Sequence, residues 1–385
     1  MQPKLVLSGL SLGNPFVGQS VYALRIIEGL SRRRDLFPFQ VIAPAAYSEI
    51  KQLVPPEHLI LLDGRPPLPH ELIANIYWAN RAASYVRKHH PDALFHSPSP
   101  IWARHQPAQT VVTLHDCIYR HFRNYLGKWF IRRQLVEATE RFAARARLVL
   151  TDSEFSKQDL MEHSPVPPEN MRVLYPWVDE RSFEPISEST LVALRAKLRL
   201  PERFWLYLGG YDYRKNVEFL VAAYADARRE SSHIPPLVLA GRIPAPGKNP
   251  VHCDVHGAIR EASLPADAVL MPGVINHADL PGLYRLASLL VYPSLMEGFG
   301  LPPAEAMAVG TPVLASNTSS LPEVVREARC RFDPSSPEDL RARLLDAARD
   351  TAEFHCALPH EFTERSGLAR YLELLGLDSP ASPAS

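Results

Sequence analysis

Two short apolar segments, separated by a glycine-rich loop and a pair of prolines, constrain the fold more than any other stretch of the chain. The first segment, 289–292, suits a buried strand of a parallel sheet that is covered on both faces. Pro302 and Pro303 fit the start of a helix, because the first helical turn needs no backbone N–H from them. Gly310 would end this helix, and residues 311–315 would begin the next strand. This order predicts part of a parallel α/β sheet.

The loop between that strand and that helix is suited to an anion. Gly298 and Gly300 let backbone N–H groups approach a ligand closely, and the helix start adds the positive end of its dipole. Glu297 lies in the loop and Glu305 in the predicted first helical turn, where each carboxylate could accept hydrogen bonds from a sugar or ribose diol. Taken singly, Glu305 would only complement the helix dipole, and Glu297 would be a solvated loop acid. Together they indicate a phosphate and sugar site.

Length and composition narrow the class of protein. A chain of 385 residues suits two domains. Lys plus Arg and Asp plus Glu both total 42, so no overall charge favours nucleic acid. The four cysteines lack Cys-x-x-Cys spacing, which disfavours a disulfide framework and a structural zinc site. With no signal-peptide pattern and no apolar run of about 18 residues, we expect a cytoplasmic protein.

A second charged loop follows another strand pattern, 204–208, and the pair Gly209–Gly210. Here Arg214 offers a planar fork of donors and Lys215 a point charge, and both suit a diphosphate when they lie between a strand and a helix. In isolation such a pair is most often a solvated surface feature. We expect it at the same sheet edge as the Glu297 loop, which favours the diphosphate interpretation.

The first part of the chain also has α/β character. Strand, loop and helix patterns cover 5–10, 11–20 and 21–30, but the loop glycines lack Gly-x-Gly-x-x-Gly spacing, which disfavours a nicotinamide cofactor. A later strand pattern from Thr110 ends in His115 and Asp116, at the edge where open α/β sheets bind ligands. A histidine there is as often structural as catalytic.

The helical stretch 126–147 alternates basic and aromatic residues. The simpler interpretation is one solvated face and one core face. The alternative is peripheral contact with a membrane surface, because basic amphipathic helices can bind at the surface of a bilayer.

The pattern Pro-Ser-x-x-Glu-Gly-Phe-Gly-Leu-Pro-x-x-Glu-Ala-Met-Ala-x-Gly-Thr-Pro-Val at 293–313 resembles the donor-site signature of family 4 retaining glycosyltransferases. Gly-x-x-x-x-Arg-Lys-Asn at 209–216 and Ser-Ser-Leu-Pro-Glu-Val at 319–324 also match that family. The resemblance implies a GT-B fold, with two Rossmann-like domains facing each other across a cleft. It places the domains at 1–180 and 186–350, a helix in 351–378 that packs back on the first domain, and a disordered tail at 379–385.

The resemblance also implies roles for individual residues. Glu305 would bind the ribose hydroxyls, Glu297 and the glycine-rich backbone the donor sugar, and His115 would face that sugar. The implied catalytic residues are His115, Asp116, Arg214, Lys215 and Glu297, and the implied donor-binding residues are Gly18, Gly210, Arg214, Lys215, Ile275, Gly298, Phe299, Gly300, Leu301 and Glu305.

Within the family, the wording of these motifs is similar to bacterial mannosyl- and rhamnosyltransferases of O-antigen or capsule synthesis. This implies transfer of a mannose-like hexose from a nucleotide-diphosphate sugar, with GDP favoured, to a glycan or a lipid-linked saccharide. No two aspartates lie two positions apart, so the Asp-x-Asp metal motif of other transferases is missing and we predict metal independence.

Three alternatives remain open from the sequence. One is a catalytically silent binding subunit of the same fold. Another is a sugar-nucleotide epimerase or a phosphorylase-like enzyme, which also use two Rossmann-like domains. The third is a hydrolase in which Glu297 and Glu305 act as acid and base.

Overall fold

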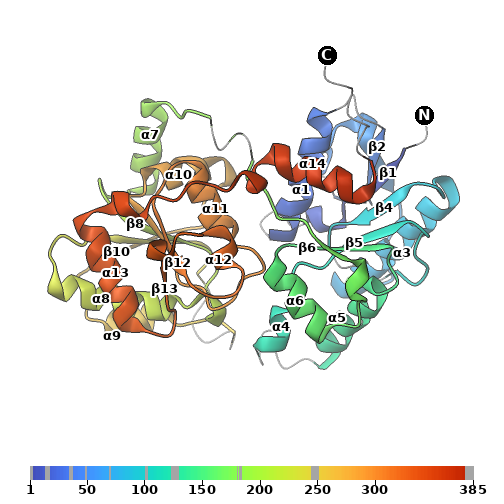
Figure 1. Cartoon of the computed structure of the whole chain (residues 1–385). Helices are drawn as coiled ribbons and strands as arrows, with labels where there is room; N and C mark the ends of the chain where they lie inside the picture. Colours follow the sequence, from blue (N-terminus) through green and yellow to red (C-terminus); the bar gives the residue numbers. More distant parts are fainter. Residues whose placement is uncertain are drawn as a thin grey trace, which may run out of the picture. The chain divides into compact units, whose positions relative to one another are not determined.

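The computed structural model describes residues 3–13, 18–33, 38–47, 50–68, 71–99, 103–122, 130–179, 181, 184–243 and 251–377. It divides the chain into two compact units (Figure 1). Unit 1 contains Met1–Cys117, Lys128–Trp177 and Glu364–Ser385. Unit 2 contains Ile118–Gly127 and Val178–Thr363. Each unit is built on a parallel sheet.

Unit 1 has a seven-stranded sheet in the order β3-β2-β1-β4-β5-β6-β7. Its strands are β1 (Leu5–Ser8), β2 (Phe39–Pro44), β3 (Leu59–Leu62), β4 (Leu94–Ser97), β5 (Thr110–Thr113), β6 (Leu148–Thr151) and β7 (Met171–Val173). Its helices are α1 (Gly18–Arg32), α2 (Ile50–Leu53), α3 (Glu71–His89), α5 (Phe130–Ala143), α6 (Glu154–His163) and α14 (Glu364–Leu375), with 3-10 turns at Leu10–Gly13, Pro56–His58 and Pro168–Asn170.

Alternate residues of the inner strand β1 pack on opposite faces of this sheet. Leu5 and Leu7 join an apolar cluster with residues of α1 and α14, whereas Val6 joins a cluster with residues of α3. Successive side chains of a strand point to opposite faces, so these clusters mark the two sides of one sheet. Burial on both faces explains why the strands of unit 1 are almost continuously apolar.

The last helix, α14, packs in unit 1 although it follows unit 2 in sequence. Gly367 makes this contact possible, because a Cβ there would come within 2.4 Å of Trp177 Cε3. Arg32 of α1 forms an ion pair with Glu364, and Tyr371 donates or accepts a hydrogen bond at 2.7 Å with His96 of β4. Helix α14 is therefore part of unit 1.

Unit 2 has a six-stranded parallel sheet in the order β10-β9-β8-β11-β12-β13. Its strands are β8 (Trp205–Leu208), β9 (Leu237–Ala240), β10 (Val269–Gly273), β11 (Leu289–Tyr292), β12 (Val313–Ser316) and β13 (Arg331–Phe332). Its helices are α4 (Ile118–His121), α7 (Glu188–Leu198), α8 (Val217–Glu230), α9 (Val255–Glu261), α10 (Leu280–Leu286), α11 (Leu301–Ala308), α12 (Leu321–Val324) and α13 (Pro337–Arg349), with 3-10 turns at Tyr213–Lys215, His277–Asp279, Ala328–Cys330, Thr351–Phe354 and His360–Phe362.

Several expected boundaries differ from the structure. The first strand ends at Ser8, because the chain turns into the 3-10 turn Leu10–Gly13. Segment 351–363 belongs to unit 2, where two 3-10 turns precede α14, and is not part of the helix that packs on unit 1. Residues 126–129 and 379–385 lie outside the described residues, so the expected helix start and the expected tail are not described.

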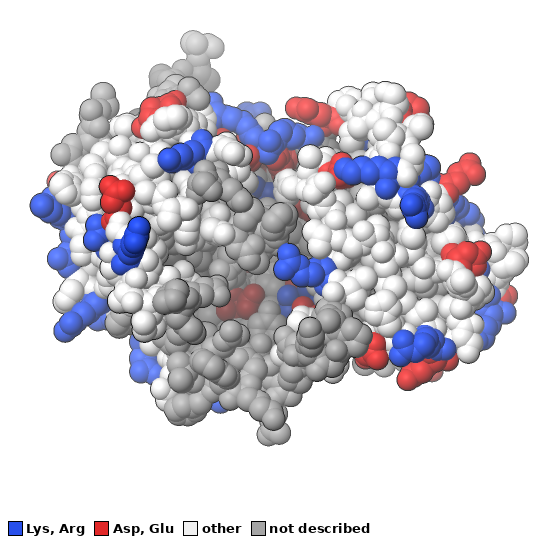
Figure 2. Space-filling model, turned by 180° about the vertical axis from the view of Figure 1, so that it is seen from behind, with Lys and Arg blue, Asp and Glu red and all other residues white. Residues whose placement is uncertain are grey.

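Charged side chains are mixed on the surface. On the face drawn in Figure 2, basic and acidic side chains are both spread over the described part of the molecule. This agrees with the equal totals of 42 basic and 42 acidic residues, and it directs attention to local clusters of charge.

Candidate functional site

In the sheet of unit 2, the order in which the chain adds strands reverses between β8 and β11. From β8 the chain continues to β9 and β10 on one side, whereas from β11 it continues to β12 and β13 on the other. Open parallel sheets bind ligands at such a switch point, beyond the carboxyl ends of the strands. The loops that leave these two strands, 209–216 and 293–300, are the two loops that the sequence marks as candidate donor-binding segments.

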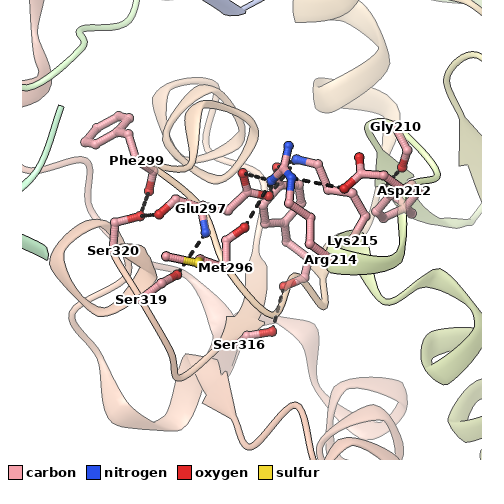
Figure 3. A network of polar contacts seen from close by, with 12 residues as sticks. Gly210, Asp212, Arg214, Lys215, Met296, Glu297, Phe299, Ser316, Ser319 and Ser320 are labelled. Carbon is pink, nitrogen blue, oxygen red and sulfur yellow. Dashed lines mark hydrogen bonds and ion pairs between the residues drawn. The ribbon is translucent and has the colours of Figure 1, made fainter. Parts of the chain in front are cut away.

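Arg214, Lys215 and Glu297 meet at this switch point (Figure 3). Lys215 Nζ donates to Glu297 Oε1 at 2.6 Å, and Arg214 Nη1 donates to Glu297 Oε2 at 2.7 Å. The same Nη1 lies 3.0 Å from the carbonyl oxygen of Met296. One carboxylate therefore bridges two cations that come from the other loop. The structure brings together three residues that the sequence predicts for one site.

Tyr292 and Asp212 complete this charge cluster, and neither was expected from the sequence. The Tyr292 hydroxyl accepts from Lys215 Nζ at 2.9 Å and donates to Glu297 Oε1 at 2.9 Å. Asp212 Oδ1 forms an ion pair with Arg214 Nε at 3.0 Å. Two cations thus face two carboxylates. The available signal was position, because Tyr292 ends β11 and Asp212 lies in the loop after β8.

The surroundings keep Glu297 ionised. Its burial alone would raise its pKa, but the charges of Arg214 and Lys215 and the hydrogen bond from Lys215 lower the pKa to about 2. Burial and the charge of Arg214 lower the pKa of Lys215, against the opposing effect of Glu297. A carboxyl group with so low a pKa holds no proton at neutral pH and cannot act as a general acid. This argues against the hydrolase alternative in which Glu297 is the acid.

Two serines fix the loop that carries Glu297. Ser319, whose φ is +52°, accepts a hydrogen bond at 3.0 Å from the Glu297 N–H. Ser320 Oγ lies 2.9 Å from the carbonyl oxygen of Glu297 and 2.8 Å from that of Phe299. The Phe299 ring packs edge-on against Phe362 at 5.0 Å. The Ser-Ser motif matched the family in sequence, but its contacts with this loop could not be read from the motif.

The start of α11 explains the glycine that precedes it. Gly300 has φ +115°, and a Cβ there would lie 2.7 Å from Leu321 Cδ2, so only glycine fits this turn. Helix α11 then begins at Leu301, and Pro302 is its second residue. No side chain forms a hydrogen bond at its N-cap. The first backbone N–H groups of a helix are suited to an anionic ligand.

Glu305 is the fifth residue of α11 and so lies in its second turn. The prediction from the sequence that it lies in the first turn is wrong. The helix begins at Leu301, ahead of both prolines, which moves Glu305 to the second turn. Its Oε2 accepts a hydrogen bond at 2.9 Å from the Tyr284 hydroxyl of α10. Glu305 therefore lies on the helix that follows the loop. It contacts Tyr284, whereas Glu297 contacts Arg214 and Lys215.

The other predicted donor residues are placed as follows. The carbonyl of Gly210, after β8, accepts a hydrogen bond from the Tyr207 hydroxyl, and Ile275, after β10, is buried. Gly18 begins α1 in unit 1, and a Cβ at Gly18 would meet no atom within 4 Å. Packing therefore does not require glycine at that position.

In unit 1, His115 is held between two acceptors. Its Nδ1 lies 2.8 Å from Asp152 Oδ2, and its Nε2 lies 2.9 Å from the carbonyl oxygen of Pro98. A carboxylate and a carbonyl are both hydrogen-bond acceptors, so this arrangement favours donation from both ring nitrogens, as in an imidazolium. Burial lowers the pKa of His115, but Asp152, Asp116 and the Pro98 carbonyl raise it more, and the net shift is upward.

Asp152 is the residue at this position that the sequence reasoning missed. It follows β6, whereas His115 follows the neighbouring strand β5, so parallel pairing brings the two strand ends together. Asp116, predicted as catalytic beside His115, is half-buried and raises the pKa of His115 by its charge. From the residues themselves, the sequence indicated only that Asp116 follows His115.

The described part of the basic stretch forms α5, where Arg133 and Arg141 have exposed side chains and ion pairs with Glu137. Lys128 and Trp129 lie outside the described residues. Among the described residues, no helix has both the length and the apolar character that crossing a bilayer requires.

Two family models match consecutive parts of the chain. The model described as "Glycosyltransferase Family 4" matches residues 16–182, and the model "Glycosyl transferases group 1" matches residues 193–366. The chain belongs to glycosyltransferase family 4. Members of this family are glycosyltransferases, and the matched segments include both loops of the charge cluster and His115.

Curated relatives fit this assignment. The serotype-specific mannosyltransferase WbdA of Escherichia coli is 30% identical over 338 residues, which are 86% of this chain and 39% of WbdA. The O-antigen chain mannosyltransferase B of Escherichia coli is 26% identical over 359 residues, which are 90% of this chain and 91% of that protein. This chain thus spans about two fifths of the first relative and nearly all of the second.

Solved structures confirm the GT-B fold of family 4. Sucrose-phosphate synthase from Thermosynechococcus elongatus has a TM-score of 0.69 and 23% identity, covering 97% of this chain and 95% of that one. HepE of Anabaena, solved with UDP and glucose, has a TM-score of 0.66 and 19% identity, covering 98% and 97%. At this level of identity the likeness establishes the fold.

Proposed function

We propose that this family 4 protein transfers a hexose, with mannose favoured, from a nucleotide-diphosphate sugar to a glycan or lipid-linked saccharide in cell-surface polysaccharide synthesis. The observation that carries the proposal is the meeting of Arg214, Lys215 and Glu297 at the switch point of the second sheet. The names of the mannosyltransferase relatives support the choice of sugar, and a GDP-linked donor follows from that choice.

The proposed chemistry needs stabilisation of a departing diphosphate while the anomeric carbon becomes cation-like. Arg214 and Lys215 are the donors for that charge, and the first N–H groups of α11 add to them. Both cations are engaged by Glu297 in this structure. A bound diphosphate would compete for them, and this exchange would release carboxylate oxygens of Glu297 toward the hydroxyls of the donor sugar.

We further propose that transfer retains the anomeric configuration and needs no metal ion at the donor. A leaving-phosphate oxygen would accept the proton of the attacking hydroxyl. In this scheme His115 faces the sugar but does not act as a base, because both of its ring nitrogens already lie against acceptors, Asp152 and the Pro98 carbonyl. We place the protein in the cytoplasm, with the basic stretch 126–147 contacting the inner face of the membrane.

Thermal unfolding with added ligands tests the donor site. GDP, UDP, ADP, dTDP and their sugars are compared, each with and without EDTA. A ligand that binds only the native state stabilises it by mass action and so raises Tm. The free energy of unfolding rises by about 2.7 kcal/mol when the ligand concentration is 100 times its Kd. We expect GDP and GDP-mannose to give the largest shift, unchanged by EDTA. The shift should be reduced in Glu305→Gln and kept in the exposed control Glu261→Gln.

The outcomes separate the alternatives. A shift with one nucleotide but no nucleotide release from its sugar, with or without a saccharide acceptor, would favour the silent subunit. Interconversion of the donor sugar would favour an epimerase. A protein that no nucleotide stabilises would overturn the proposed donor site.

A further inference from the structure

A thiol, a carboxylate and an imidazole gather at one point of unit 1, apart from the charge cluster of unit 2. Cys117 Sγ lies 3.0 Å from Asp159 Oδ2, and His163 Nδ1 lies 3.1 Å from Asp159 Oδ1. One ligand atom from each of the three residues lies within 4.8 Å of the others. We propose that Cys117, Asp159 and His163 form a divalent-metal site, for which Zn²⁺ is the best-suited ion.

The distances are close to those of a tetrahedral zinc site. With zinc bonds of about 2.0 to 2.3 Å, neighbouring ligand atoms lie roughly 3.3 to 3.8 Å apart. The two measured separations are 3.0 and 3.1 Å. The two separations end on different oxygens of Asp159, and His163 Nδ1 also lies 2.9 Å from the backbone carbonyl oxygen of Asp159. Binding of an ion would therefore need rotation of the Asp159 and His163 side chains.

The spacing of the ligands along the chain supports the same conclusion. Asp159 and His163 are four residues apart on α6 and share one helix face. The expectation against a zinc site relied on Cys-x-x-Cys spacing, which does not detect mixed Cys, His and Asp sets.

Local charge also favours a cation. Cys117 is fully buried and Asp159 is 7% exposed. The carboxylates of Asp159, Asp116 and Glu140 all act electrostatically on Cys117. A divalent ion would offset this concentration of negative charge. On binding, the thiol would lose its proton to solvent and the thiolate would form the bond to the metal.

The position of the cluster gives the metal a structural role. Cys117 lies two residues after His115, and α6 begins two residues after Asp152. An ion bound by Cys117, Asp159 and His163 would tie the segment that carries His115 to the helix that follows Asp152. This role is independent of the donor site, so the inference holds whether or not the proposed function is correct.

Metal analysis of the full chain, purified without chelator and without a histidine tag, tests the inference. We expect about one equivalent of zinc by elemental mass spectrometry. After its removal, Co²⁺ should give the charge-transfer absorption of a cobalt–thiolate bond, and added Zn²⁺ should abolish that absorption. Cys117→Ser and His163→Ala should lower zinc affinity at least tenfold, whereas Cys253→Ser and His360→Ala, the matched controls, should not.

The competing explanation is a thiol that only donates a hydrogen bond to Asp159. It predicts no stoichiometric metal, no cobalt–thiolate absorption and no rise of Tm with added zinc. Any of these results in the wild-type protein would overturn the proposal. If Cys117→Ser does not fold, the cobalt spectrum of wild type and the zinc affinity of His163→Ala decide, because His163 is partly exposed.

Discussion

The two units hold their charged groups in different ways. In unit 2, Arg214, Lys215 and Glu297 lie in two adjacent loops, and one carboxylate engages two cations. In unit 1, His115 and Asp152 form a single pair, and the second ring nitrogen faces a carbonyl. The cluster in unit 2 can give two cations to an anionic ligand, whereas the pair in unit 1 fixes the direction of one ring. We infer that unit 2 supplies charge and unit 1 supplies orientation.

Lys215→Met should have the largest effect on stability. The change leaves the buried Glu297 with one fewer cation, and breaking a buried ion pair costs about 3 to 5 kcal/mol. The double variant Lys215→Met/Glu297→Gln should lose less than the sum of the single losses, with a coupling energy of about 1 to 3 kcal/mol. Urea unfolding of the four proteins measures this, with the exposed Lys197→Met as control. Additive losses would show that the cluster is not coupled.

Arg214→Ala should mainly affect turnover. Removing one donor that stabilises developing charge lowers kcat about 10²- to 10³-fold. Its side chain is 13% exposed, so some loss of stability accompanies the change, and rates are compared below the onset of unfolding. The measurement is nucleotide release from the donor sugar that stabilises the protein. The control Arg349→Ala, at a side chain that is 78% exposed, should leave the rate unchanged. A wild-type rate in Arg214→Ala would show that Arg214 does not contribute to catalysis.

The dependence of stability on pH should reveal Glu297. Its pKa of about 2 in the folded protein lies below the usual glutamate value of 4.5. A lowered carboxyl pKa contributes stability above the unfolded pKa, and this contribution is lost as pH falls through the folded pKa. The difference in unfolding free energy between wild type and Glu297→Gln should therefore shrink between about pH 5 and pH 2, by up to about 3 kcal/mol. A difference that stays constant with pH would show that Glu297 is not specially stabilised as an anion.

Much of unit 2 could be predicted from the sequence because its information is local. The strand, glycine-rich loop and helix of 289–308 each carry their own signal, and Arg214 and Lys215 are adjacent in the chain. The position of Glu305 could not be predicted to the residue. The helix start depends on the backbone conformation of Gly300, which packs against Leu321 of a different helix.

The contacts of unit 1 were harder to predict because they join distant residues. His115 pairs with Asp152, 37 positions later, and His96 meets Tyr371, 275 positions later. Only strand order and the return of α14 bring these residues together. For the same reason, the contact between Cys117 and Asp159, which are 42 positions apart, could not be predicted from the sequence.

Asp152→Asn should have the smallest effect and is the sharpest test of the division between the units. The amide can still accept from His115 Nδ1, but the charge of the acceptor is lost, so we expect about 1 kcal/mol less stability. If unit 1 only orients a ring, the nucleotide-induced rise in Tm should be retained in this variant while turnover falls. Asp226→Asn, with a side chain 48% exposed, should change neither quantity. Loss of the nucleotide-induced shift in Asp152→Asn would mean that unit 1 also contributes to nucleotide binding, and the contrast between charge in one unit and orientation in the other would fail.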